Sequence, residues 1–233
     1  MTREKIRAFW TERAKVTSLP RSESQVNFEN DSEIADLRIK TETELIDAEL
    51  PLKAGDTVVD LGAGNGRFSL LFAPKVHKVI AVEFIDDFAR SIEKQASERH
   101  IRNIKVLNMP AEDFCIDDSA DIVFVSGLLH YLDPDQYNRT VSNISKILKR
   151  GCTLFLRETI SVLEDEFFID KFSEELGANY CSLYRTKDQI VRSFSEQGFH
   201  LEKICPFFPD GSVLNKRVET RLYYFTFRNV GTH

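Results

Sequence analysis

The fold is decided by one stretch, Val58-Val59-Asp60-Leu61-Gly62-Ala63-Gly64-Asn65-Gly66-Arg67-Phe68. A short apolar run ends in an acid, three glycines then alternate with other residues, and a helix-like pattern follows. This order is typical of a buried strand that turns tightly into the N-terminus of a helix. Because glycine has no Cβ and adopts positive φ without steric cost, it is used where a ligand lies against the backbone. The stretch therefore predicts a ligand-binding turn.

A second acid stands at an informative distance from the glycines. The apolar run at 79–82 predicts the next strand, and Glu83 ends it, 19 residues after Gly64. An acid about 20 residues beyond such glycines is placed to accept hydrogen bonds from ribose hydroxyls. Together the two signals predict a cleft for a nucleotide-type cofactor.

The glycine spacing separates two classes of cofactor. A dinucleotide fingerprint reads G-x-G-x-x-G, but here Gly66 comes one residue early and Arg67 occupies the fingerprint position, which disfavours a nicotinamide oxidoreductase. The pattern from Asp60 to Gly66, D-x-G-x-G-x-G, resembles the first motif of the class I S-adenosylmethionine-dependent methyltransferases, small-molecule type. The resemblance implies S-adenosylmethionine as the cofactor, with its methionine end against the glycine loop.

The composition and charge of the chain limit the kinds of partner that we expect. There are 31 basic and 37 acidic residues, for a formal charge of −6, and the basic residues are scattered, which argues against a nucleic-acid footprint. The longest apolar stretch, 122–129, is too short to span a bilayer, and the first residues predict a charged helix rather than a signal peptide. The four cysteines form no C-x-x-C pair, as expected of a reduced, cytoplasmic protein. Monomer and homodimer both remain open.

Strand-like and helical patterns alternate through the middle of the chain. Strands are expected at 57–61, 78–83, 104–107, 120–126 and 152–157, which predicts a parallel sheet with a ligand crevice at the carboxyl ends of its strands. Asp133 and Pro134 predict the start of the helix after the fourth strand, and Gly151 its C′ residue. Thr186 and Gln189 predict a capping box for a later helix.

Two further strands are expected at 199–208 and 217–228, with no helix between them, so they should be antiparallel neighbours. Such a terminal pair also resembles the methyltransferase fold. The resemblance implies an α/β, Rossmann-like fold with seven mostly parallel strands. Their order would be 3-2-1-4-5-7-6, with strand 7 antiparallel, helices on both faces and an N-terminal helical cap.

The single domain of residues 1–233 divides into three parts. Residues 1–54 should form the helical cap: a helix at 2–15, a loop at 17–30, and a helix capped by Ser32. The expected inward face of that second helix is Ile34, Leu37, Thr41, Leu45 and Ala48. The resemblance implies a cap folded over the cofactor and acceptor, with Phe9, Trp10 and Phe28 as pocket walls, whereas a plainer reading gives it packing alone.

Residues 55–158 form the expected cofactor-binding half, and 159–233 the acceptor-lid insertion with the terminal strand pair. The insertion has aromatic and apolar residues at mixed helical spacing, Phe167, Phe168, Phe172 and Leu176. These phenylalanines predict an enclosed and partly apolar acceptor pocket.

The resemblance assigns the cofactor contacts residue by residue. Asp60, Gly62, Ala63, Gly64 and Gly66 would surround the methionine moiety. The ribose and adenine would lie against Glu83, Phe84, Ala111, Glu112 and Asp113, with Asp113 favoured at the adenine edge and a solvated turn as the alternative for both acids. Ser126 and Gly127 would approach the cofactor through their backbone.

Three side chains are candidates for catalysis. His130 can act as a general base, because an imidazole titrates in the required range, or it can simply pack. Tyr184 could bind or deprotonate an acceptor. Arg185 offers a planar fork for a carboxylate or phosphate-like group, unless it pairs with Glu158 or Asp188.

Two further pairs of residues end or follow a strand of the predicted sheet. Arg157 and Glu158 end the fifth strand as either a salt bridge or an acceptor clamp. Asp133 and Asp135 follow the fourth strand, but the helix start explains the first of them, so no metal is expected.

The expected function follows from the cofactor motif, the acidic charge and the Phe-rich insertion. It is the transfer of a methyl group from S-adenosylmethionine to an O or N nucleophile of a small metabolite that bears a carboxylate or phosphonate. The alternatives are a protein or RNA methyltransferase and a non-catalytic protein that binds the cofactor.

Overall fold

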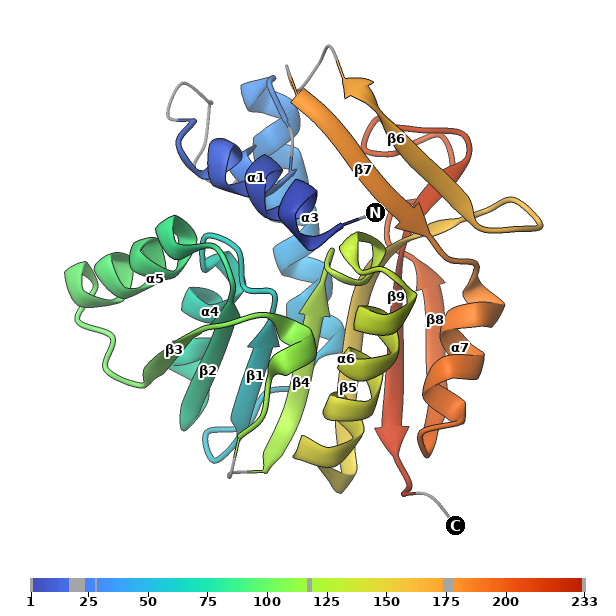
Figure 1. Ribbon diagram of the computed structural model, residues 1–233. Coiled ribbons are helices and arrows are strands. Elements are labelled where there is room, and N and C mark those ends of the chain that lie inside the picture. The colour runs from blue at the N-terminus through green and yellow to red at the C-terminus, as the bar shows by residue number, and fades with distance from the viewer. Residues whose placement is uncertain (1, 17–23, 28, 117–118, 174–177, 232–233) are drawn as a thin grey trace.

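A seven-stranded sheet forms the centre of the molecule (Figure 1). The computed structural model describes residues 2–16, 24–27, 29–116, 119–173 and 178–231. The strands of the sheet are β1 (Thr57–Leu61), β2 (Lys78–Glu83), β3 (Ile104–Asn108), β4 (Ala120–Ser126), β5 (Leu148–Ser161), β8 (Phe199–Pro206) and β9 (Thr220–Asn229). Their order is β3-β2-β1-β4-β5-β9-β8. Only β9 runs antiparallel to its neighbours β5 and β8. This confirms the predicted fold class, with β8 and β9 as its sixth and seventh strands.

Helices cover both faces of the sheet because successive residues of its strands point to opposite sides. Val59 packs in one apolar cluster with α6 (Pro134–Ile147) and α7 (Lys187–Ser195). Val58 packs in another with α4 (Arg67–Phe72) and α3 (Ser32–Glu49). A further helix, α5 (Asp86–Glu98), follows β2. Three short 3₁₀ turns follow α4, β3 and β4, namely η1 (Ala73–Lys75), η2 (Ala111–Asp113) and η3 (Leu129–Tyr131).

Most of the predicted helix starts are correct. Asp133 and Gln136 form a capping box at α6, and Thr186 and Gln189 form another at α7. Asp31, rather than the predicted Ser32, caps α3, because its carboxylate accepts hydrogen bonds from two backbone N–H groups of the first turn at 2.8 and 3.0 Å.

Gly151 is not the C′ residue of α6, which corrects the prediction. The helix ends at Ile147, and Leu148 enters the sheet at once as the partner of Ala120. A register shift follows on β4 between Ala120 and Ile122. Gly151, with φ of +80°, lies in this irregular part of β5.

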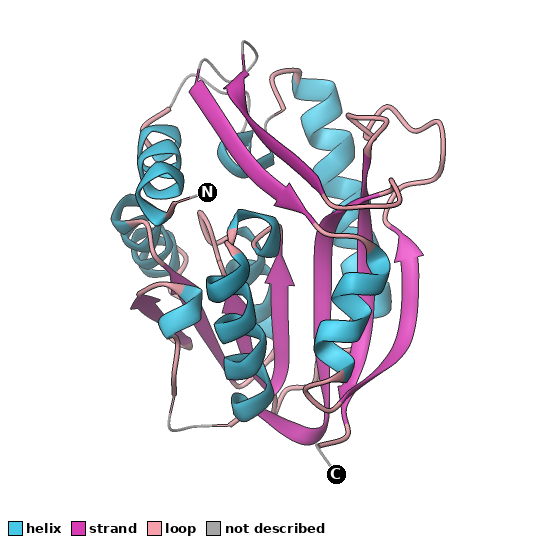
Figure 2. Cartoon of the chain, turned by 45° about the vertical axis from the view of Figure 1, so that its right-hand side comes forward, coloured by secondary structure: helices cyan, strands magenta, loops and turns pink. Residues whose placement is uncertain are grey.

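The insertion after β5 is a β-hairpin and not a helix, which also corrects the prediction. Strands β6 (Phe167–Ser173) and β7 (Ala178–Tyr184) pair antiparallel as a separate two-stranded sheet. The hairpin lies over the carboxyl end of the main sheet (Figure 2). Phe168 and Phe172 are 51% and 59% exposed, whereas Ile169 is buried, so the period of β6 is two. Leu176 lies outside the described residues.

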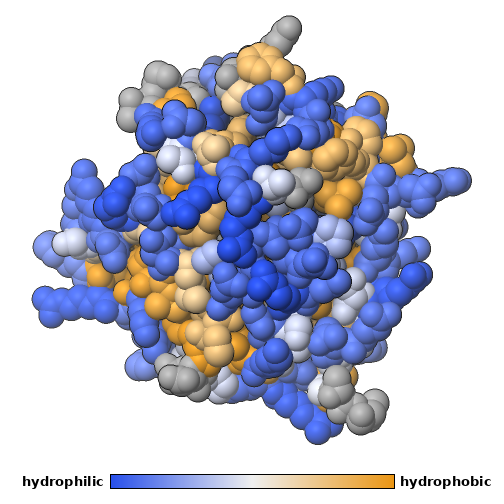
Figure 3. Space-filling model, in the orientation of Figure 1, coloured by the Kyte–Doolittle hydropathy of each residue, from blue (hydrophilic) through white to orange (hydrophobic). Residues whose placement is uncertain are grey.

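The hairpin and the N-terminal helix pack against each other. A cluster of Ile6, Phe9, Ile169, Tyr180 and Tyr184 joins α1 (Arg3–Ala14) to β6 and β7. Figure 3 shows one apolar area at the upper right, on the side where the hairpin lies, and another at the lower left, with hydrophilic residues between them.

The N-terminal segment also differs from the prediction in its loop and in the buried face of α3. A short helix, α2 (Ser24–Asn27), interrupts the expected loop, and residues 17–23 and Phe28 lie outside the described residues. In α3 the predicted inward residue Leu37 is 45% exposed. The buried residues of α3 are Ala35, Arg38, Glu42 and Ile46.

Candidate functional site

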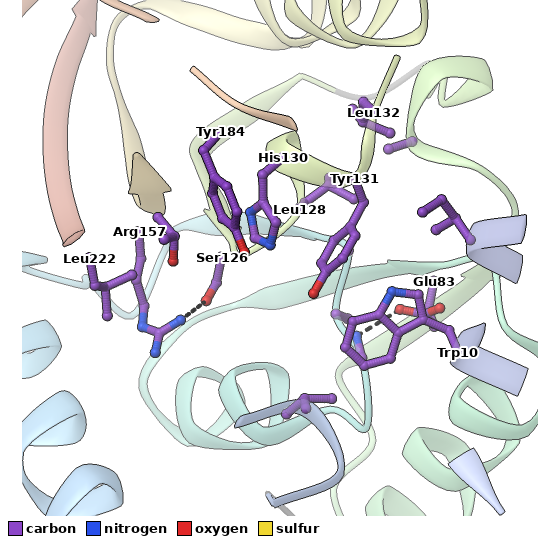
Figure 4. A pocket seen from close by; sticks show the side chains of 18 of the residues that line it. Trp10, Glu83, Ser126, Leu128, His130, Tyr131, Leu132, Arg157, Tyr184 and Leu222 are labelled. Atoms are coloured by element: carbon purple, nitrogen blue, oxygen red, sulfur yellow. Dashed lines mark hydrogen bonds between the residues drawn. The ribbon is translucent and has the colours of Figure 1, made fainter. Parts of the chain in front are cut away.

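A cavity of about 520 Å³ opens at the carboxyl ends of β1, β2, β4 and β5. Helices α1 and α2, the β6–β7 hairpin and the β8–β9 connection also line it. Figure 4 shows Arg157 and Leu222 at one end, Glu83 and Trp10 at the other, and His130 and Tyr184 between them. A cavity at this edge of a mostly parallel sheet is the expected ligand site.

The glycine loop forms one wall of the cavity through its backbone. The N–H groups of Gly62 and Ala63 both donate to the carbonyl of Val82, at 2.9 and 3.0 Å. Gly62 and Gly64 have φ of +78° and +56°, and Gly62, Ala63 and Gly64 line the cavity. An added Cβ at Gly64 would lie 3.1 Å from Val26 of α2. The loop therefore leaves a narrow space that suits a ligand lying on bare backbone.

Gly66 has a different role from the one predicted. It does not line the cavity; it is the left-handed N-cap of α4, with φ of +86°. A Cβ there would lie 2.7 Å from Cγ1 of Ile92 on α5. Gly66 thus allows two helices to pack closely and supports the loop from behind.

Two buried acids face the cavity beside the loop. Glu83 accepts hydrogen bonds from the N–H groups of Gly64 and Ile85, both at 2.7 Å, and burial raises its pKa to about 7. Asp60 accepts a hydrogen bond from the Ser69 hydroxyl at 2.6 Å, and burial raises its pKa to about 6. Both acids lie where the sequence placed them, and each is oriented by a hydrogen bond.

After β3 the acid that lines the cavity is Glu112, one residue before the predicted Asp113. Ala111 and Glu112 line the cavity, and Glu112 accepts hydrogen bonds from Arg3 at 2.5 Å and from Gln136 at 2.7 Å. Asp113 is exposed and pairs with Arg139 at 3.2 Å. Glu112, rather than Asp113, is the acid of this segment that reaches the site.

His130 lies in the cavity wall with one ring nitrogen already bonded. Its Nδ1 lies 2.9 Å from Oε2 of Glu158, whose Oε1 accepts from the N–H groups of Leu128 and Leu129 at 2.6 and 2.9 Å. Since Glu158 is fully buried, the imidazole is held at a fixed angle with Nε2 left for a ligand. Glu158 is neither the partner of Arg157 nor the partner of Arg185.

Tyrosines surround the imidazole. The ring of Tyr184 stacks on that of His130 at 5.2 Å between centroids, and its hydroxyl lies 2.8 Å from that of Tyr180. The hydroxyl of Tyr180 in turn lies 3.1 Å from that of Tyr131. Burial raises the pKa of Tyr184 well above its ordinary value, so its hydroxyl stays protonated. Tyr184 is therefore equipped to donate a hydrogen bond.

The aromatic walls agree in part with the prediction. Trp10 and Phe84 line the cavity, and the Trp10 ring meets that of Tyr131 edge-on at 5.3 Å. Phe9 is buried behind Trp10, at 5.2 Å between the ring centroids, and does not line the cavity.

Arg185 does not reach the cavity, contrary to its predicted role as an acceptor anchor. Its guanidinium donates to the carbonyls of Leu129 and Leu132, at 2.9 and 3.1 Å, and lies over the ring of Tyr137. It thus binds both ends of η3, the turn that carries His130, and acts on the site through that turn.

The basic wall of the cavity was missed by sequence reasoning, apart from Arg157. Arg157 donates to the hydroxyl of Ser126 at 3.1 Å, and Gly127 donates its N–H to the Arg157 carbonyl at 2.8 Å. Arg38 and Arg67 lie in the same wall. The β8–β9 connection adds Lys216 and Arg217, and the start of β9 adds Arg221. The spacing of Arg38 and Glu42, four residues apart on one helix, was the available signal.

Two other features, a metal site and a membrane-spanning helix, are absent from the described residues. Within them, no group of three His, Cys, Asp or Glu side chains is arranged to hold a metal ion. No helix in the same part of the chain is long and apolar enough to cross a membrane.

Comparison with known proteins adds a family to this geometry. Residues 58–151 match the family described as "Methyltransferase domain". Phosphoethanolamine N-methyltransferase 1 of Triticum aestivum is 36% identical over 132 residues, which is 55% of this chain and 26% of that protein. The Caenorhabditis elegans protein of the same name is 32% identical over 115 residues, 49% of this chain and 24% of that protein. The matches thus span about a quarter of the length of these curated relatives.

Solved structures share the fold. The Haemonchus contortus phosphoethanolamine N-methyltransferase 1, in complex with phosphoethanolamine and S-adenosylhomocysteine, has a TM-score of 0.73 at 21% identity and covers 100% of this chain and 51% of that one. A putative S-adenosylmethionine-dependent methyltransferase of Listeria monocytogenes has a TM-score of 0.69 at 15% identity, covering 82% and 98%. Residues 58–151 thus resemble the methyltransferase-domain family, and the chain shares the fold of these two solved methyltransferases.

Proposed function

We propose that this chain transfers a methyl group from S-adenosylmethionine to an O or N nucleophile of a small metabolite that bears a carboxylate or phosphoryl-type group. The observation that carries the proposal is the division of one cavity into two walls of opposite charge. Asp60, Glu83 and Glu112 stand on the glycine-loop side, and Arg157, Arg217 and Arg221 stand on the other. His130 lies between the two walls (Figure 4).

The glycine-loop wall fits the cofactor. Positive φ at Gly62 and Gly64 leaves bare backbone at the cavity surface, and Glu83 presents carboxylate oxygens of the kind that accept hydrogen bonds from ribose hydroxyls. When bound, the cofactor supplies an electrophilic methyl group on a sulfonium. The chain's own task is then to orient the acceptor and to remove its proton.

The geometry supports His130 as the general base. Glu158 accepts a hydrogen bond from Nδ1–H, which fixes the tautomer in which Nε2 carries a lone pair. That lone pair can take the proton of an ammonium or hydroxyl acceptor. Tyr184, which is kept neutral, can orient the same acceptor through its hydroxyl.

The opposite wall supports an anionic acceptor. Lys216 and Arg217 belong to the connection between β8 and β9, Arg221 lies at the start of β9, and all three line the cavity. The relatives named above are phosphoethanolamine N-methyltransferases by name, and phosphoethanolamine joins an anionic phosphate to an amine. A cavity of about 520 Å³ also suits a metabolite better than a folded protein or RNA.

Two measurements test the proposal in sequence. Titration calorimetry with S-adenosylmethionine, S-adenosylhomocysteine and NADH should show binding of the two sulfur nucleotides alone. A turnover assay should then show methylation of phosphoethanolamine, or of another phosphoryl- or carboxyl-bearing amine or alcohol, and not of the uncharged analogue with the same nucleophile. NADH binding alone would refute the cofactor. Cofactor binding with no turnover on any acceptor would favour a non-catalytic protein.

A further inference from the structure

Three arginines converge on one buried carboxylate in the cavity wall. Glu42 of α3 is 0% exposed and pairs with Arg38 at 3.3 Å, with Arg67 at 2.5 Å and with Arg157. The arginines come from three elements: α3, the first position of α4 after the glycine loop, and the carboxyl end of β5. We call these four residues the arginine cluster.

The cluster holds more positive than negative charge. Its three guanidinium groups face the single carboxylate of Glu42, and their side chains are 7–9% exposed. Glu29 adds a second carboxylate by pairing with Arg38 at 2.6 Å, but it also pairs with Lys216 at 3.4 Å. Buried charge that is not compensated is costly. The surplus therefore calls for an anion.

Arg157 is the member whose hydrogen bonding is incomplete. Its Nη2 binds Glu42, and its Nη1 binds the neutral hydroxyl of Ser126. In the part of the chain that the structure describes, its buried Nε finds no acceptor, although Arg157 is 92% buried. An unsatisfied buried donor costs about 1–3 kcal/mol. Arg157 also lines the cavity, so this incompletely bonded guanidinium lies beside the space that a ligand would occupy.

A purely structural role accounts for only part of these facts. Pairing α3 with the sheet through Glu42 needs one arginine, and here all three arginines also line the cavity. Although burial alone would raise the pKa of Glu42, the arginines lower it to about 2. Glu42 thus stays charged, and the positive surplus persists at neutral pH.

We propose that the arginine cluster, through Arg157, is a binding subsite for a carboxylate or phosphate group of a ligand in this cavity. The proposal rests on the proposed function and deepens it. Two sources of the anion are possible there. One is the α-carboxylate of the cofactor, because Arg67 follows the glycine loop, and the other is the anionic group of the acceptor, because Arg157 of β5 pairs with Ser126 at the end of β4. Arg38 and Arg67 hold Glu42 in place, and Arg157 faces the ligand.

The test compares Arg157→Met with the wild type and with Arg228→Met, an exposed arginine that pairs with Glu202 outside the cavity. Calorimetry measures the binding of S-adenosylhomocysteine and of 5′-methylthioadenosine, which lacks the amino-acid carboxylate. If the cofactor is the source, Arg157→Met weakens the first about tenfold and leaves the second unchanged. If the acceptor is the source, the affinities for both nucleosides stay unchanged, and the KM for phosphoethanolamine rises about tenfold.

Inorganic phosphate is a third probe that does not depend on the proposed function. It should raise the melting temperature of the wild type and of Arg228→Met, and not that of Arg157→Met. The phosphate experiment tests the anion subsite even if the wild type binds no sulfur nucleotide. In that case only the proposed function fails.

Glu42→Gln covers the case in which Arg157→Met does not fold. Loss of the competing carboxylate should increase the affinity for the same anion several-fold. If Glu42 had only a structural role, the variant would simply be less stable. The proposal is overturned if Arg157→Met binds all three probes and the acceptor as the wild type does, or if Glu42→Gln leaves the affinity for the anion unchanged or weaker.

Discussion

The two walls of the cavity differ in charge and in the way the chain builds them. The glycine-loop wall comes mainly from residues 60–65, together with Glu83 at the end of the next strand, and is largely backbone. The basic wall brings together side chains of α3, β5 and the β8–β9 connection, which are far apart in the sequence. A wall made of one continuous motif has a sequence signature, and a wall made of scattered side chains has none. The following changes test whether the walls act as separate units.

Loss of the imidazole between the walls should have the largest effect. His130→Ala should lower kcat by about 10²–10⁴-fold, the usual contribution of a general base, and leave the affinity for S-adenosylhomocysteine within about twofold. Turnover under saturating acceptor and calorimetry measure the two quantities. An unchanged kcat would show that His130 only packs.

Glu158→Gln should reduce kcat by about 100-fold, because its amide N–H₂ would face Nδ1 and favour the tautomer with the proton on Nε2. ¹⁵N chemical shifts of the imidazole report the tautomer directly. Glu166→Gln, an exposed substitution, is the matched control. If the shifts and kcat both stay unchanged, Glu158 does not set the tautomer.

Glu83→Gln should alter how stability depends on pH. The folded protein binds a proton at Glu83 more tightly than the unfolded chain, since burial raises the pKa from 4.5 to about 7. The contribution of Glu83 to stability is thus greatest at low pH and is lost as the pH rises from about 4.5 to about 7, by about 2 kcal/mol. Denaturant unfolding at pH 5 and pH 7.5 should show a smaller decrease in the variant. An equal decrease in both proteins would contradict the raised pKa.

On the cofactor side, Glu83→Ala should weaken S-adenosylhomocysteine binding about tenfold, because a charged acceptor for ribose hydroxyls is lost. The apparent KM of the acceptor, measured at saturating cofactor, should change little. Calorimetry and steady-state kinetics separate the two. A large rise in the acceptor KM with intact cofactor binding would mean that the walls are assigned in reverse.

The smallest effect is expected on the opposite wall. Arg217→Met should raise the KM of an anionic acceptor about three- to fivefold, because Arg217 is only partly buried and its charge is screened. The effect should shrink in 0.5 M salt, and Arg99→Met, at the exposed C-cap of α5, should show none. A rise in KM for an uncharged acceptor as well would argue for a change of shape rather than of charge.

The fold and the cofactor wall were predictable because local patterns determine them. The alternation of strands and helices predicts the parallel sheet. The spacing of Gly64 and Glu83 predicts that both belong to one wall, where the Gly64 N–H donates to Glu83. The two acids after β3 were predicted one residue out of register, because a single 3₁₀ turn decides that Glu112 points inward and Asp113 outward. Local sequence does not encode that choice.

The basic wall and the hairpin were not predictable for different reasons. In α3 the apolar stripe pointed to Leu37, whereas the buried stripe contains Arg38 and Glu42, which are stable inside only because Arg67 and Arg157 arrive from elsewhere. In the insertion, several phenylalanines fit a helix as well as a strand, and pairing between β6 and β7 decided the outcome. Both results depend on tertiary partners.

The position of β9 between β5 and β8 has a consequence for synthesis of the chain on the ribosome. The cofactor wall and β5 are made first, but the edge of β5 stays open until residues 162–229 have followed. At about 5–20 residues per second, this delay is on the order of 3–14 s. An open apolar strand is a site for pairing with other chains, so the nascent protein is most exposed to aggregation just before its last strand arrives.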